Sequence, residues 1–426
     1  MSSLNLDDFT DRIQRPHGSV RRDAEARRER LAVPAGSLGR LDELGEWLAA
    51  AQHTVPVRPL DRPKVVLFAA DHGVAALDVS GRPAGTASWL VRDVLEGVSP
   101  VAVLARREGV PLRIVDVGLD CEPEALPAEV TARRVRAGSG RIDIEDALTA
   151  EEAETAFRVG MEIADEEADA GTDLIVLGDL SVGGTTPAAV LVAALCGTDA
   201  SVVTGRGGAG IDDLAWMRKC AAIRDSLRRA RPVLGDQLKL LAAVGGADLA
   251  AMTGFLLQCA VRRTPVILDG VVSAAAALVA QRAAFRAPDW WLAGHSSGEP
   301  AQAKALDRMA LEPLLDHGVT VGEGVGALLA LPLVRAAAAL AAELPEIGES
   351  PTPAEPGEPA GSAEAAASAG APEAAAPAEP VTPADAAGPP AEPVTPTAPA
   401  GPVTPADPAG PVAPADASGP AERNAG

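Results

Sequence analysis

The sequence predicts an α/β fold built on a parallel sheet. Short apolar runs rich in valine and isoleucine alternate with longer helical patterns, as expected for strands that are covered on both faces. The runs Val65 to Ala70 and Leu112 to Val117 flank a helix expected from about Thr86 to Arg106. Because a strand, a helix and a second strand form a crossover unit, these two strands should be parallel.

Further elements follow the same alternation along the chain. Residues 1 to 33 are polar and rich in arginine, which is typical of a solvated helical face. The turn from Pro34 to Arg40 leads into a helix with apolar residues on one face. An acidic helix from about Thr149 to Ala170 precedes the central strand, Leu174 to Leu177. Three more strands are expected at Ser201 to Thr204, Val266 to Leu268 and Trp290 to Ala293.

The charge and the cysteines limit the class of protein. The 426 residues carry a formal charge of −22, and from Glu346 onward twelve acidic residues stand against one arginine, so that this segment accounts for −11. An acidic chain without a basic stripe argues against a nucleic-acid partner. Four scattered cysteines suggest neither a zinc site nor a disulfide framework. Since the sequence shows no export signal and its apolar stretches are short, we expect a cytoplasmic protein without a membrane partner.

The segment from Glu346 to Gly426 has the composition of a disordered acidic tail. Proline, alanine, glycine and glutamate dominate it, and Pro-Val-Thr-Pro recurs at 380–383, 393–396 and 402–405. Such a segment has little apolar surface to bury. Proline-rich repeats can serve as protein ligands, but a passive extension is their commoner role.

Two glycine loops are candidates for binding an anion. The first follows the central strand, where Gly183 and Gly184 precede Thr185 and Thr186 at an expected helix start. It lacks the lysine of a Walker motif, so an NTP site is not expected. The second, Gly205 to Asp213, is out of register with a dinucleotide fingerprint. A single loop of this kind is more often a simple connection between elements, but two such loops after successive strands favour a phosphate site.

Polar residues mark the carboxyl ends of the expected strands, where open α/β sheets bind ligands. Asp71 and His72 follow the first strand, and Asp269 and His295 follow two later ones. Together these edges should line one long cleft. His72 could act as a general base, although a structural histidine is the commoner role.

Glu323 is the main catalytic candidate from the residues themselves. It lies between Gly322 and Gly324 in an apolar neighbourhood, which would raise the pKa of its carboxyl group toward that of a useful base. A turn glutamate that faces water is the alternative.

These segments together resemble the nicotinate-nucleotide:dimethylbenzimidazole phosphoribosyltransferase family of cobalamin biosynthesis. The likeness covers most of residues 30 to 340. It rests on eight segments in the family's order: Pro34 to Leu41, Ala70 to Ala75, Val115 to Gly118, Gly178 to Ala189, Gly205 to Asp213, Leu268 to Ala275, His295 to Pro300 and Leu311 to Ala327.

The resemblance implies a homodimer with a Rossmann-like parallel sheet in each subunit. It places a catalytic region at residues 1–345, before the tail at 346–426. Within that region, a large α/β part would span about 61–324, and a small helical part would come from both ends, about 1–60 and 325–345.

The resemblance also implies a reaction between two small molecules. Dimethylbenzimidazole displaces nicotinate from the ribose of nicotinate mononucleotide, with Glu323 as the base that removes the benzimidazole proton. No metal or cofactor is implied. The implied substrate-binding residues are Asp71, Ser80, Asp179, Gly183, Gly184, Thr185, Thr186, Gly205, Arg206, Gly207, Gly208 and Lys219.

The chain departs from the family pattern at the central loop and the base-binding loop. The family usually has glutamate, glycine and asparagine where this chain has Asp179, Ser181 and Gly184. In addition, Arg82 to Gly85 replaces a common Tyr-Pro-Gln-Glu, and the Gly205 loop holds one extra residue. These changes leave one alternative open, a non-catalytic or altered-specificity mononucleotide-binding paralogue. The Pro-Val-Thr-Pro repeats of the tail alone suggest a second alternative, an interaction scaffold.

Overall fold

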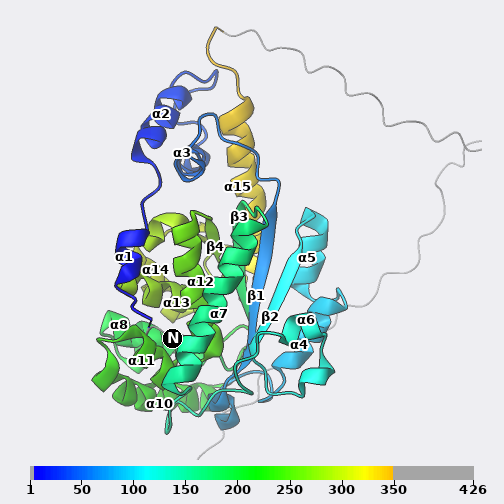
Figure 1. Ribbon diagram of the computed structural model, residues 1–426, viewed down its shortest axis with the longest axis vertical. Helices are drawn as coiled ribbons and strands as arrows, with labels where there is room; N and C mark the ends of the chain where they lie inside the picture. Colours follow the sequence, from blue (N-terminus) through cyan, green and yellow to red (C-terminus); the bar gives the residue numbers. More distant parts are fainter. Residues whose placement is uncertain (1–3, 349–426) are drawn as a thin grey trace, which may run out of the picture. The chain divides into compact units, whose positions relative to one another are not determined.

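The computed structural model describes residues 4–348 and contains the predicted parallel sheet (Figure 1). Six parallel strands run in the order β2-β1-β3-β4-β5-β6. The register places Val65 of β1 opposite Leu112 of β2 on one side and opposite Val176 of β3 on the other. The strands are β1 (Pro63–Asp71), β2 (Leu112–Gly118), β3 (Leu174–Val182), β4 (Val266–Leu268), β5 (Trp291–His295) and β6 (Pro313–Leu315).

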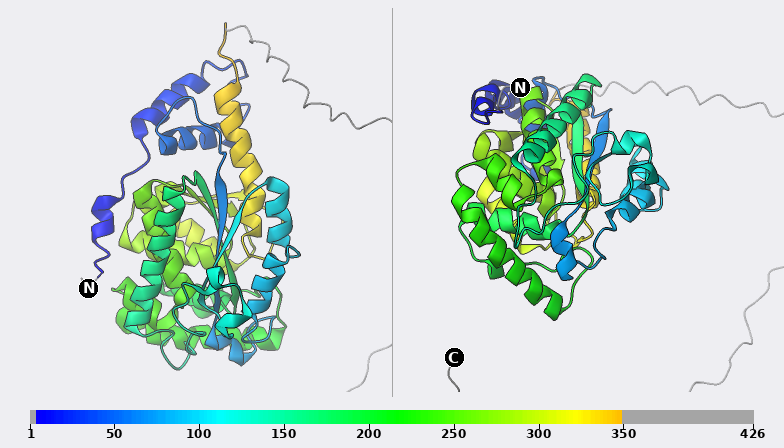
Figure 2. Two further views of the ribbon diagram at one scale, coloured as in Figure 1. Left: turned by 45° about the vertical axis from the view of Figure 1, so that its right-hand side comes forward. Right: turned by 60° about the horizontal axis from the view of Figure 1, so that its bottom comes forward.

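Helices cover both faces of this sheet (Figure 2). Alternate side chains of β1 enter two separate apolar cores: Phe68 joins the core beneath α7, α8, α12 and α13, and Leu67 joins the core beneath α4, α5 and α15. The helices are α1 (Asp8–Arg12), α2 (Gly18–Arg28), α3 (Arg40–Gln52), α4 (Ala87–Leu95), α5 (Pro100–Glu108), α6 (Ala128–Thr131), α7 (Ala150–Asp169), α8 (Thr185–Cys196), α9 (Ala200–Val203), α10 (Asp213–Ala230), α11 (Gln237–Val244), α12 (Ala247–Arg262), α13 (Val271–Ala283), α14 (Pro300–Met309) and α15 (Val325–Glu343).

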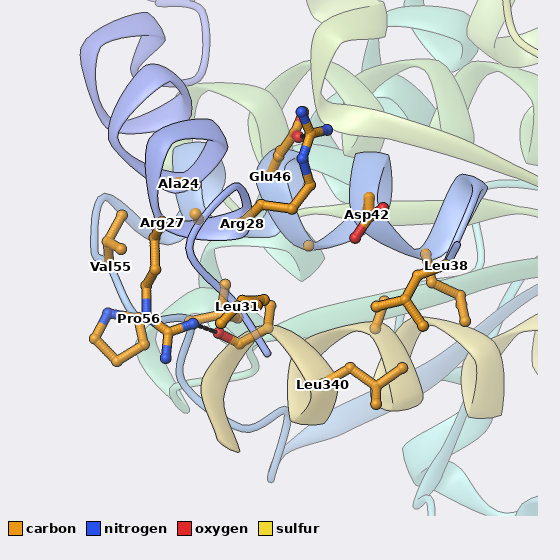
Figure 3. Close-up of a pocket in the computed structure, with 16 residues that line it drawn as sticks. Ala24, Arg27, Arg28, Leu31, Leu38, Asp42, Glu46, Val55, Pro56 and Leu340 are labelled. Atoms are coloured by element: carbon orange, nitrogen blue, oxygen red, sulfur yellow. Dashed lines mark hydrogen bonds and ion pairs between the residues drawn. The ribbon is translucent and has the colours of Figure 1, made fainter. Parts of the chain in front are cut away.

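Helices from the two ends of the described chain, α2 and α3 near its start and α15 at its end, meet at one end of the sheet. Helices α2 and α3 pack together, and α3 packs on α15. They enclose an apolar pocket of about 420 Å³, in which Arg28 contacts the buried carboxylate of Glu46 and Leu340 of α15 is part of the wall (Figure 3). A small helical part was predicted from these ends of the chain, and its exact boundaries stay a prediction.

Two predicted elements were wrong in detail, and one strand was not predicted. The segment Ser201 to Thr204 is helical in α9 rather than a strand. The helix expected from Thr86 to Arg106 is two helices, α4 and α5, because Gly97 takes a φ of 76° and Ser99 caps a new helix that starts at Pro100. Strand β6 was missed, since three half-buried residues give almost no periodic signal. The predicted disordered tail lies outside the described residues, apart from its first three positions.

Helix α15 is long and apolar enough to cross a membrane by length and composition alone. Half of its most apolar stretch is buried, and it packs on α3, α5 and β5. A core helix passes the same test, and the contacts of α15 are those of a core helix.

The crossing of α7 and α12 leaves no room for a side chain at Gly160. A Cβ atom there would overlap the carbonyl of Ala251 and lie 2.8 Å from the backbone nitrogen of Phe255. Gly160→Ala must therefore separate the two helices and should lower the free energy of unfolding by about 1–3 kcal/mol. Urea unfolding measures this. Gly235→Ala, where a Cβ meets open space, is the control and should change stability by less than about 0.5 kcal/mol.

Candidate active site

The main polar cleft lies at the carboxyl edge of the sheet. It has a volume of about 870 Å³ and opens beside the junction of β1 and β3, where the strand order reverses direction. This is the position at which open α/β sheets bind ligands. Its lining comes from the loops after five strands, from β3 and α4, and from the loop between α9 and α10: Val79, Ser80, Gly81, Arg82, Leu90, Asp179, Ser181, Gly183, Gly184, Thr185, Arg206, Gly207, Gly208, Ala209, Gly270, Val271, Val272, Ser297, Glu299, Thr320, Val321, Gly322 and Glu323.

The first glycine loop connects β3 to the N-terminus of α8. Gly183 has a φ of 85°, and a Cβ there would lie 3.1 Å from the side chain of Ala75. The twelve-residue helix α8 begins directly after it, with Thr185 in the cleft wall. Thr186, by contrast, is fully buried and does not line the cleft. The positive end of the helix dipole therefore faces the cleft.

The second glycine loop is held between two segments. Its Gly207 N–H donates to Oε1 of Glu299 at 2.7 Å, and a Cβ at Gly208 would lie 3.0 Å from the carbonyl oxygen of Val321. Gly205 is packed against the Glu299 carboxylate, where no side chain would fit. Arg206 lines the cleft but turns its guanidinium away, toward Asp213 and the carbonyl of Ile211.

Lys219 places a buried cation beside both loops. Its ammonium group donates to Oγ1 of Thr185 at 2.8 Å, and a Cβ at Gly207 would lie 4.0 Å from Nζ. Burial lowers the pKa of Lys219, and the charge of Glu299 opposes that effect. Among residues 4–348, no carboxylate forms an ion pair with it. Because a buried cation needs a counter-charge, this end of the cleft suits a phosphate.

The departures at the central loop form one connected set. The hydroxyl of Ser181 donates to Oδ2 of Asp179 at 2.6 Å, so the serine contacts the carboxylate that stands in place of the family's glutamate. A Cβ at position 184 would overlap the Ser181 hydroxyl, which explains why Gly184 accompanies the serine. Burial, with smaller effects from Asp248, Asp269 and Glu323, raises the pKa of Asp179 to about 7, although the Ser181 hydrogen bond opposes it.

Glu323 occupies the turn that leads into α15. The residue is buried, and its own φ of 60° lies in the left-handed region, as do those of Gly322 and Gly324. Burial raises its pKa, and Arg82, whose guanidinium lies 3.6 Å from Oε1, lowers it. A buried carboxylate with a raised pKa in a ligand cleft fits a general base.

Other predicted residues lie outside the cleft lining. The two oxygens of Asp71 accept the N–H groups of Ala87 and Asp120, which ties the loop after β1 in place. His72 is buried and its Nε2 lies 3.0 Å from Oδ2 of Asp248. Burial alone would lower the pKa of His72, but Asp248 raises it overall. Both residues support the cleft from behind.

The sequence did not single out Glu299 as a site residue, and it marked Arg82 only as a departure in the base-binding loop. Asp269 and His295 were expected to line the cleft, and neither does. The Asp269 carboxylate instead accepts the N–H groups of Gly324 and Ala327. Glu299 follows β5 in the segment His295 to Pro300, so its position after a strand end was the available signal. Within the described part of the chain, no group of three or more His, Cys, Asp or Glu side chains is arranged to hold a metal ion.

The cleft therefore has the features of an enzyme active site: two glycine loops beside a buried cation, which suit an anionic group, and a buried carboxylate, Glu323, which suits a general base. The family model described as Phosphoribosyltransferase matches residues 13–350. The chain belongs to this phosphoribosyltransferase family.

Relatives in sequence and structure agree. The chain is 81% identical over 345 residues to the nicotinate-nucleotide–dimethylbenzimidazole phosphoribosyltransferase of Streptomyces avermitilis, which covers 81% of this chain and 92% of that protein. It is 77% identical to the Streptomyces coelicolor enzyme of the same name, over 83% of this chain and all of that protein. The crystal structure of CobT from Thermus thermophilus matches with a TM-score of 0.72 at 38% identity, over 76% of this chain and 96% of that one.

Asp179 should make stability depend on pH. Its folded pKa of about 7 exceeds the unfolded value of about 3.9, so the stability that its protonated form contributes is complete below about pH 4 and is lost as the pH rises through 7. Asp179→Asn, always neutral, should gain up to about 3 kcal/mol relative to the wild type between pH 5 and 8.

Urea unfolding at both pH values measures this difference. Asp225→Asn is the control, because the partly exposed carboxylate of Asp225, beside Arg224, has a lowered pKa and keeps its charge over this range. An Asp179→Asn variant that tracks the wild type at both pH values would contradict the assignment.

Proposed function

We propose that the chain transfers the phosphoribosyl group of nicotinate mononucleotide to 5,6-dimethylbenzimidazole, which yields α-ribazole 5'-phosphate and nicotinate for the nucleotide loop of cobalamin. The relatives that carry this enzyme name at 81% and 77% identity support the substrates. The observation that carries the proposal is Glu323, a buried carboxylate in the wall of the cleft that also holds both glycine loops. The non-catalytic alternative has no support from these relatives.

The chemistry asks little of the protein beyond position and one proton transfer. One ring nitrogen of dimethylbenzimidazole attacks C1 of the ribose, and the bond from C1 to the pyridinium nitrogen breaks as nicotinate leaves with that electron pair. The proton on the other benzimidazole nitrogen passes to Glu323. Holding the two reactants in line supplies much of the acceleration, and the base supplies the rest.

We assign the phosphate of the nucleotide to the Lys219 end of the cleft. The N-terminus of α8, the Gly205 to Gly208 loop and the Lys219 ammonium favour an anion there. The apolar side chains of Leu90, Val271 and Val272 line another part of the same cleft and suit an aromatic ring.

We further propose a cytoplasmic homodimer. A second subunit would cover apolar side chains that are exposed on α4 and in the turn between α4 and α5, such as Trp89 at 55% and Val98 at 65% exposure.

Replacing the base should slow turnover strongly and leave the binding of nicotinate mononucleotide unchanged. Glu323→Gln retains shape but cannot accept the proton, so nicotinate release should fall by about a hundredfold or more. Wild-type activity should decline on the acid side as Glu323 protonates, at a higher pH than for an ordinary glutamate, because its pKa is raised. The residual activity of the variant should lack that limb.

The assay is nicotinate release from nicotinate mononucleotide and dimethylbenzimidazole across pH. The control is Glu312→Gln, which changes an exposed glutamate directly before β6 and should behave as the wild type. If the wild type releases no more nicotinate than Glu323→Gln, the proposed function is wrong.

Lys219→Met should weaken the binding of the nucleotide without unfolding the protein. The change removes a buried cation whose charging is penalised by burial, so the free energy of unfolding should stay equal or rise. The KM for nicotinate mononucleotide should increase about tenfold or more, as for a lost phosphate contact. The exposed Lys239→Met is the control. An unchanged KM would place the phosphate elsewhere.

A further inference from the structure

The turn that carries Glu323 is tied to the end of a neighbouring strand. Asp269 follows β4 and is buried, with 1% of its surface exposed. Its Oδ2 accepts the N–H of Gly324 at 3.0 Å, and its Oδ1 accepts the N–H of Ala327 at 3.0 Å. Both donors lie within four residues of Glu323, so this one carboxylate fixes the start of α15.

This turn needs an external hold. Gly322, Glu323 and Gly324 have φ values of 73°, 60° and 83°, and the left-handed region is unfavourable for a residue with a Cβ. Within the turn itself, the N–H of Val325 donates a hydrogen bond to the carbonyl of Gly322 at 3.0 Å. The Asp269 carboxylate supplies two charge-assisted hydrogen bonds from outside the helix, which are stronger than neutral ones.

The charge of Asp269 also acts on the carboxyl group of Glu323. The charged groups that act on Glu323 are Arg82 after η1 (Gly73–Leu77), Asp93 on α4, Asp179 on β3 and Asp269 on β4. Of these, Arg82 favours the ionised carboxylate, and the acidic groups favour its protonated form. His295 of β5 lies beside Asp269, with Nδ1 3.7 Å from Oδ1.

We propose that Asp269 is a positioning residue for the general base: it holds the Glu323 turn through two backbone N–H groups and places a fixed negative charge behind the base. The inference rests on the proposed function, since it needs Glu323 to take the proton. Asp269 does not line the cleft and acts on the reaction only through Glu323.

The test is the pH dependence of kcat for nicotinate release in four variants. Asp269→Asn keeps one acceptor oxygen but loses the second and the charge. Its kcat should fall about ten- to a hundredfold through displacement of the base, and its acid limb should move down by about half a pH unit or more. The KM for nicotinate mononucleotide should stay within about threefold, because the phosphate loops are untouched.

Two further variants separate charge from position. Asp269→Glu keeps the charge and displaces the turn, so kcat should fall while the acid limb stays. Arg82→Met removes the cation on the other side of Glu323, so the acid limb should move to higher pH. These opposite shifts cannot come from a general loss of stability.

Asp116→Asn is the matched control. Asp116 is a buried carboxylate within β2, three strands away from β4 in the sheet. It accepts the N–H groups of Gly118 and Leu119 and pairs with Arg134. It should lose stability with an unmoved acid limb. The inference is wrong if Asp269→Asn has the kcat of the wild type, or if the acid limb of its pH profile does not move. If Asp269→Asn does not fold, a wild-type kcat in Asp269→Glu overturns the inference. Either failure, alongside a Glu323-dependent wild type, leaves the proposed function intact.

Discussion

The site depends on how closely α15 approaches the ends of three strands. A Cβ at Gly178 of β3 would lie 2.5 Å from the backbone nitrogen of Gly324, and a Cβ at Gly294 of β5 would lie 2.6 Å from Cα of Ala327. Gly326 in turn leaves room for the ring of His295. Any side chain at these positions would push the helix start outward. The glycines therefore set where Glu323 sits relative to the sheet.

The carboxyl edge of the sheet collects acidic side chains in an acidic protein that binds an anion. This conflict is resolved locally. Asp71, Asp116 and Asp269 each accept two backbone N–H groups, so their charges are used to fix loops. Asp179 instead has its pKa raised to about 7, which reduces its repulsion of a phosphate in the same cleft. Lys219 then provides a buried cation next to both glycine loops.

Sequence patterns predicted the sheet better than the contacts of the site. Strands β1 to β5 were predicted from apolar runs, because strands buried on both faces have continuous signals. The strand predicted at 201–204 was wrong. Val202 and Val203 favour a strand, but they have no neighbouring strand to pair with, and Val202 is exposed. The break between α4 and α5 was readable in Gly97 and Pro100, and it was overlooked.

The motifs located the cleft, but pairwise contacts needed coordinates. The resemblance named Glu323 and both glycine loops, which do line one cleft. It could not show that Ser181 and Gly184 accompany Asp179, because that link is a hydrogen bond and a steric overlap. Similarly, Asp269 and Glu323 are separated by more than fifty residues in sequence, and only the parallel sheet brings them together.

We propose that the phosphate of the nucleotide binds next to Lys219 and the reacting carbon next to Glu323, in the same cleft. A crystal structure of Glu323→Gln with nicotinate mononucleotide and dimethylbenzimidazole would show both positions. We expect the phosphate between Thr185, Gly207 and Lys219, with C1 of the ribose and the benzimidazole next to position 323. A phosphate bound at Arg82, with the nicotinate ring at Lys219, would contradict it.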